Sequence, residues 1–162
     1  MAKKGGKSLL SLSTLLASFF GAAMIALAFA YFNYKFSEYK FINFKEWVFY
    51  EKSELFTPTA DKYIIVFYSS KEKGTMNQLA QINLNIKILA IDYYNNARKN
   101  TPTTTFLRSG TKNSLNFIQR FNIYESPSIF IIKKYKDSIY KQDSMIRKLD
   151  NLDQLSKQIN NL

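Results

Sequence analysis

The stretch Phe121-Asn122-Ile123-Tyr124-Glu125-Ser126-Pro127-Ser128-Ile129-Phe130-Ile131-Ile132 gives the clearest signal for the fold. Its first residue suits the end of a helix, its centre suits a short loop, and its last residues form an apolar run typical of a buried strand. Pro127 lies directly before that strand. A proline there is either an ordinary trans residue at a strand start or a cis residue in a tight turn.

Strands and helices are predicted to alternate on both sides of this stretch. Runs of β-branched and aromatic residues indicate strands, and apolar residues three or four positions apart indicate helices. The predicted strands are residues 63–68, 86–91, 128–132, 138–140 and 144–148, and the predicted helices are 75–83, 113–121 and 150–162. This order favours an α/β fold with a partly parallel sheet.

Three local predictions accompany this order. The polar residues 95–105 are predicted to form a loop. Asn113 is a candidate N-cap for the helix over 113–121, whose apolar face would contain Leu115, Ile118 and Phe121. The basic run 133–136 is predicted to be a solvated turn rather than a contact for nucleic acid.

Residues 61–162 resemble the thioredoxin family in length, in element order and in the motif around Pro127. The resemblance implies a thioredoxin-like domain with a central mixed sheet flanked by helices, and it implies that Pro127 is the family's cis proline. It also places Lys73-Gly74-Thr75-Met76 where the family has Cys-x-x-Cys. A thiolate is the nucleophile of thiol–disulfide exchange, so the family's redox activity does not extend to this chain.

The composition excludes several kinds of chemistry. The 162 residues are 46% hydrophobic, enough for a packed core, and contain no Cys and no His. Thiol catalysis, thiolate metal sites and a Ser-His-Asp site are therefore impossible. The charge of +11 suits an anionic membrane or an acidic partner, or reflects a Lys-rich coding bias. We expect no enzyme activity, cofactor, metal, nucleic acid or small-molecule substrate.

An apolar N-terminal segment predicts a membrane anchor. Residues 8–34 carry no charge, and three lysines lie in residues 1–7. About 20 apolar residues span a bilayer, and flanking lysines stay in the cytoplasm. We therefore expect a single-pass protein of the bacterial inner membrane with its C-terminal domain in the periplasm. The alternative is a signal peptide cleaved after the A-x-A sequence Ala28-Phe29-Ala30.

The aromatic juxtamembrane segment, residues 35–60, has no single interpretation. Aromatic residues alternate with lysines here, and Phe41, Phe44 and Val48 share a helical face. A short helix at the membrane surface fits this pattern. The alternatives are an element that packs on the soluble domain and an interface with a partner protein.

These features predict a non-catalytic scaffold that docks on other proteins of an envelope assembly. By resemblance, the first choice of assembly is the bacterial flagellar motor. Thioredoxin folds hold extended peptides beside the cis-proline loop, so the candidate protein-binding groove is Lys73, Gly74, Met76, Tyr124, Ser126 and Pro127. The alternative for these residues is plain scaffold. The alternative function is a thiol-independent chaperone or assembly factor for envelope or respiratory complexes.

Overall fold

The chain forms two compact units, one that ends at Glu38 and one that follows it. The computed structural model describes residues 11–149 except residues 39, 73, 83 and 97. The helix predicted over 150–162 and the groove residue Lys73 therefore lie outside the described residues.

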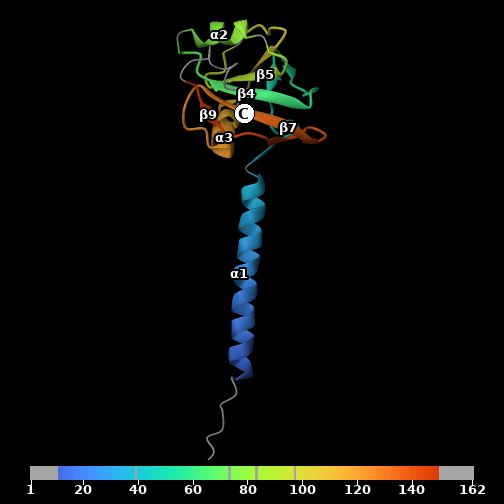
Figure 1. The fold of residues 1–162 in the computed structure, drawn as a ribbon, viewed down its shortest axis with the longest axis vertical. Helices are drawn as coiled ribbons and strands as arrows, with labels where there is room; N and C mark the ends of the chain where they lie inside the picture. Colours follow the sequence, from blue (N-terminus) through green and yellow to red (C-terminus); the bar gives the residue numbers. More distant parts are fainter. Residues whose placement is uncertain (1–10, 39, 73, 83, 97, 150–162) are drawn as a thin grey trace, which may run out of the picture. The chain divides into compact units, whose positions relative to one another are not determined.

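The first unit is a single long helix, α1, over Leu12–Glu38 (Figure 1). Its segment Leu12–Lys35 is long and apolar enough to cross a membrane, and its described side chains are exposed almost throughout. A helix that is apolar on all sides requires apolar surroundings. The helix confirms the predicted apolar span, whereas both an anchor and a signal sequence have this length and composition.

The second unit is built on one mixed sheet. The strand order is β1-β8-β7-β4-β5-β6-β2-β3, and β9 pairs with β7. Strands β4, β5 and β6 are parallel, whereas β7 is antiparallel to β4 and β8 is antiparallel to β7. The bounds are β4 Lys62–Tyr68, β5 Lys87–Asp92, β6 Thr104–Arg108, β7 Ser128–Lys136, β8 Ile139–Gln142 and β9 Arg147–Lys148.

Two helices cover opposite faces of this sheet. Figure 1 shows α2 (Thr75–Gln81) on one side and α3 (Thr111–Phe121) on the other. Alternate residues of β4 enter separate apolar clusters, with Ile65 on the α3 side and Ile64 and Val66 on the α2 side. A strand that is buried on both faces is apolar along its whole length, which explains why β4 and β5 were predictable from sequence.

Residues 40–60, which the aromatic pattern set apart from the domain, contribute strands to the same sheet. They contain β1 (Phe41–Asn43), β2 (Tyr50–Glu51) and β3 (Glu54–Leu55), and β1 pairs with β8. Phe44 and Phe49 are buried in the α3-side cluster. The surface helix considered for this stretch is therefore not formed, because its aromatic residues are buried in the domain instead.

Three local predictions were wrong. The end of the predicted loop over 95–105 belongs to β6, where Thr104 and Phe106 are buried and the Thr104 hydroxyl donates to the Leu79 carbonyl at 3.3 Å. Gly110, not Asn113, is the N-cap of α3, and the side-chain amide of Asn113 donates to the Val48 carbonyl at 2.8 Å.

The basic run 133–136 is a continuation of β7, because β8 supplies its hydrogen-bonding partner strand. The face of α3 also differs from the prediction. Ser114, Phe117 and Phe121 are buried, whereas Leu115 is 51% exposed. Phe117 packs against the rings of Phe49 and Phe67, which the chain brings from either side of residue 60.

The element order that the thioredoxin resemblance implies is present up to residue 149, before the predicted last helix. It consists of β4-α2-β5 followed by α3-β7-β8, with β6 inserted before α3. The Ser126–Pro127 peptide bond is cis, as predicted. The second unit is thus a mixed α/β domain with thioredoxin-like element order.

Candidate functional site

Two loops at one edge of the sheet contain the candidate groove residues other than Met76, which lies in α2. Strand β4 ends at Tyr68 and leads through residues 69–74 into α2. Strand β7 begins at Ser128, which pairs with Phe67, so the cis-proline loop over 122–127 lies at the same edge. Ligands of open α/β sheets bind at the carboxyl ends of parallel strands, so the topology brings the predicted groove residues to an appropriate place.

The cis-proline loop is held by hydrogen bonds at both of its ends. Asn122 ends α3 in the left-handed conformation, and the Ile123 amide donates to the Ile118 carbonyl at 2.9 Å. The Ser128 hydroxyl donates to the Glu125 carbonyl at 2.5 Å. Asn is one of the few residues that adopt this conformation readily. The loop is therefore fixed at its start by the end of α3 and at its end by the Ser128 side chain.

Strand β9 occupies one side of this loop. Lys148 pairs with Ser128, and the Leu149 amide donates to the Pro127 carbonyl at 2.8 Å. An ion pair of 2.9 Å between Lys148 and Glu125 also joins β9 to the loop. Because β4 lies on the other side of Ser128, this end of β7 has a partner strand on both sides. An extended peptide can therefore pair with the main chain here only at Ser126, unless it displaces β9.

The groove residues differ in what they offer to a partner. Tyr124 is 87% exposed, whereas Ser126 and Pro127 are half-buried, and the Ser126 hydroxyl has no hydrogen-bond partner within the described part of the chain. Gly74 is exposed with φ +88°. Met76 lies in the first turn of α2. The structure thus brings the loops of Gly74 and Tyr124 to one edge of the sheet, where the Tyr124 side chain is exposed.

Asp92 is the buried carboxylate at this edge, and its oxygens hold the surrounding loops. One oxygen accepts the amides of Ser70 at 2.9 Å and Tyr94 at 3.2 Å, and the other accepts the Asn96 amide at 2.8 Å. The Asn96 side chain also donates to the Ser70 hydroxyl at 2.5 Å. The sequence alone does not single out Asp92, because the amides that it binds come from two separate loops.

Tyr68 lies beside Asp92 in the sheet register and is fully buried. Its hydroxyl has no hydrogen-bond partner among the described residues. Burial, and then the charge of Asp92, raise the pKa of Tyr68 well above its ordinary value, while Arg98 acts in the opposite direction. The phenol is therefore neutral at physiological pH, so it can donate a hydrogen bond but cannot act as a base.

A surface hollow of about 520 Å³ lies elsewhere, between the segment after β1 and helix α3. Its lining residues are Glu46, Trp47, Lys112, Asn113, Asn116, Gln119 and Arg120. The Arg120 guanidinium lies 5.4 Å from the centre of the Trp47 ring. The hollow contains none of the six predicted groove residues. Sequence reasoning missed it because residues 35–60 were not assigned to the domain.

A comparison with solved structures shows a distant similarity to a known protein. The crystal structure of yeast Sco1 with copper bound is similar to this chain with a TM-score of 0.40 and 11% sequence identity, and the match covers 64% of this chain and 80% of Sco1. A TM-score of this size transfers neither copper binding nor any other property to this chain. No protein-family model and no curated protein matches the sequence.

Proposed function

We propose that the chain is a non-catalytic, membrane-anchored interaction protein that docks on a larger assembly of the bacterial envelope. In this proposal α1 spans the inner membrane and the α/β domain lies in the periplasm. The apolar length of α1 supports the anchor. The lack of Cys and His, together with the use of all the Asp92 oxygens in loop contacts, supports a role other than catalysis.

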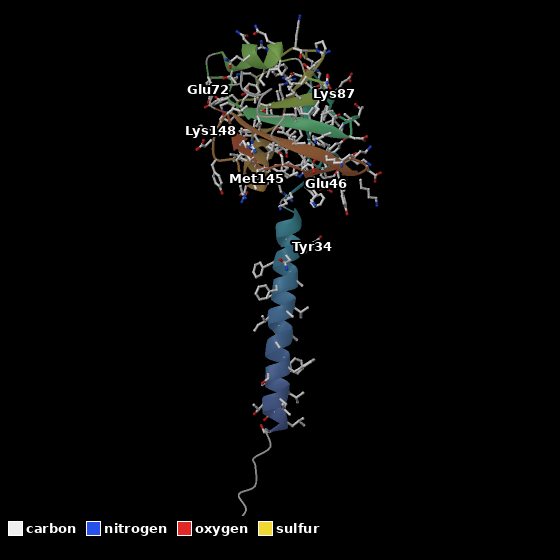
Figure 2. The ribbon with its side chains drawn as sticks, in the orientation of Figure 1. Tyr34, Glu46, Glu72, Lys87, Met145 and Lys148 are labelled. Atoms are coloured by element: carbon white, nitrogen blue, oxygen red, sulfur yellow. The ribbon has the colours of Figure 1, made fainter. Side chains whose placement is uncertain are left out.

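One observation supports docking most directly. Tyr124 and Met145 are 87% and 81% exposed, and they lie on two segments that the Glu125–Lys148 ion pair joins. Figure 2 shows Met145 and Lys148 on the same side of the domain. Exposed aromatic residues and methionine are enriched at protein interfaces, particularly where the backbone is already ordered. We call Tyr124 and Met145 the docking pair.

Co-purification from detergent tests the proposal. The intact chain is expected to retain a stoichiometric partner after chemical cross-linking, and the double variant Tyr124→Ala and Met145→Ala is expected to lose it. The matched control is Leu55→Ala, which removes a side chain that is 63% exposed on β3, at the other end of the strand order. Equal recovery with both variants contradicts docking through this pair.

The identity of the assembly stays a prediction. A periplasmic scaffold of the flagellar motor is the first choice, and recovery of motor proteins in the same experiment would support it. A thiol-independent chaperone is the alternative, for which the recovered proteins would be varied and sub-stoichiometric. The mass of the purified chain tests the anchor separately, because a mature N-terminus at Tyr31 would mean that α1 is a cleaved signal sequence.

A further inference from the structure

A row of directly paired residues crosses four strands at the end of the sheet away from the cis-proline loop. Lys62 of β4 pairs with Lys133 of β7, Lys133 pairs with Lys141 of β8, and Lys141 pairs with Phe41 of β1. Residues that are directly opposite in antiparallel strands project from the same face. Three lysines and one aromatic side chain therefore share one face of the sheet.

Tyr135 extends this row. Its ring lies 5.2 Å from the ring of Phe41 in an edge-to-face contact, and the Lys141 ammonium lies 5.7 Å from the centre of the Phe41 ring. Tyr135 is 68% exposed. We call Lys62, Lys133, Lys141, Phe41 and Tyr135 the basic face. Lysine and tyrosine side chains with apolar stems and polar ends are suited to the boundary between lipid and water.

Most side chains of the basic face are exposed because the buried α2-side cluster ends before it. Two residues further along the same strands, Ile64 and Ile131 are buried in the α2-side cluster. Lys133, Lys141 and Tyr135, in contrast, are exposed and belong to neither of the two buried clusters. This part of the sheet therefore presents its side chains outward.

The charges around the basic face favour an anionic partner. Lys40 and Lys136 are also exposed nearby, and the acidic residues of the same region are Asp61, Asp137 and Asp143. Asp143 pairs with Lys62 at 3.8 Å, and both side chains are nearly half exposed. Five lysines thus outnumber three aspartates. Clusters of this kind bind anionic lipid surfaces, and each cation near the surface strengthens binding about fivefold.

The chain connection favours lipid over an acidic protein. Only residues 39 and 40 separate the end of α1 at Glu38 from the start of β1 at Phe41. Three residue steps cover at most about 11 Å, so the β1 edge is tethered near the end of the helix in any orientation of the domain. We infer that the basic face binds the anionic headgroups of the bilayer that holds α1, an inference that rests on the proposed membrane anchor.

Site-specific labelling of the full chain tests this inference, because a chain without Cys can be labelled at one introduced thiol. A fluorophore at Lys136→Cys reports on the basic face, and a fluorophore at Ser53→Cys, an exposed site between β2 and β3, is the control label. The chain is reconstituted in nanodiscs that contain headgroup-quencher lipid, with either phosphatidylcholine alone or added phosphatidylglycerol. We expect strong quenching at residue 136 only in the anionic discs, and loss of that quenching in 1 M salt.

Two charge variants complete the design. The triple variant Lys62→Gln, Lys133→Gln and Lys141→Gln is expected to weaken the bound state by up to about 100-fold, at about fivefold per lysine. The matched control Lys87→Gln, Lys99→Gln and Lys112→Gln removes three exposed lysines elsewhere and is expected to quench like the parent. Trp47 fluorescence verifies that both variants are folded.

Three results would overturn the inference. They are equal quenching in neutral and anionic discs, equal loss of quenching in both charge variants, and quenching at residue 136 that an added acidic protein relieves but salt does not. Release of the chain from the discs by alkaline carbonate refutes the anchor instead. In that case, salt-sensitive flotation of the chain with added anionic vesicles, compared between the two charge variants, still tests the basic face.

Discussion

Substitution of Asp92 provides the most direct test of whether the hydrogen bonds at this edge of the sheet stabilise the fold. Its two oxygens accept three backbone amides, from Ser70, Tyr94 and Asn96. A hydrogen bond to a charged group contributes about 1.5–3 kcal/mol. In Asp92→Asn one oxygen becomes an NH₂ group that faces a backbone amide, so one bond is lost and the others become neutral. We expect a loss of about 3 kcal/mol, a large part of the ~5–15 kcal/mol that stabilises a domain.

Urea unfolding of the full chain in detergent measures this loss. Trp47 is the single tryptophan and lies 6.2 Å from the ring of Phe117, so its fluorescence reports on the domain core. At a typical slope of about 1–3 kcal/mol per molar urea, the midpoint is expected to fall by about 1–3 M. The control Asp143→Asn breaks only the exposed 3.8 Å pair with Lys62 and is expected to cost less than about 0.5 kcal/mol. An Asp92→Asn midpoint equal to that of the control would refute the structural role of Asp92.

Three further stability predictions use the same assay. Burial, with smaller contributions from Tyr63 and Asp61, raises the pKa of Tyr140 to about 12. In the unfolded chain the pKa of tyrosine is about 10. The contribution of the Tyr140 hydroxyl to the free energy of unfolding is therefore complete below pH 10 and is lost as the pH rises through 12, by about 1.4 kcal/mol per pH unit. Between pH 9 and pH 11.5, Tyr140→Phe should lose less stability than the parent chain. Gly74→Ala should destabilise the domain by about 1 kcal/mol, because the φ of this residue is +88°. The added methyl group itself has space, so a variant more stable than the parent would contradict this backbone conformation. Phe117→Ala should cost about 3–5 kcal/mol because the ring is fully buried, and a loss below 1 kcal/mol would contradict its central place in the core.

The predictable parts of the fold were those in which burial follows a regular pattern. Strands β4 and β5 are apolar runs, and the cis-proline motif has a distinctive order of residues. Strand β6 was missed because Thr104 and Thr105 resemble a polar loop, although Thr104 is buried and its hydroxyl is hydrogen-bonded. Residues 40–60 were separated from the domain because aromatic side chains suit a membrane surface and a protein core equally well.

The surroundings of the candidate groove were predictable only in part, for a different reason. The motif around Pro127 specifies the loop, but the position of β9 depends on pairing between distant segments, which no local pattern reveals. Asp92 is similar, because a strand-end carboxylate in sequence does not identify the amides that three-dimensional folding brings to it. Side chains whose role depends on long-range partners were therefore recognised only from the structure.

The position of β9 bears on the choice between scaffold and chaperone. A client peptide that added as a strand beside Ser128 would have to displace β9, with its bond from the Leu149 amide to the Pro127 carbonyl. Leu149 is 1% exposed, and exposing a buried leucine costs about 1.5–3 kcal/mol, to which each lost hydrogen bond adds about 1 kcal/mol. A peptide must recover this free energy before it gains affinity. A partner that contacts Tyr124 and Met145 displaces nothing, so docking through exposed side chains is favoured over capture of extended clients.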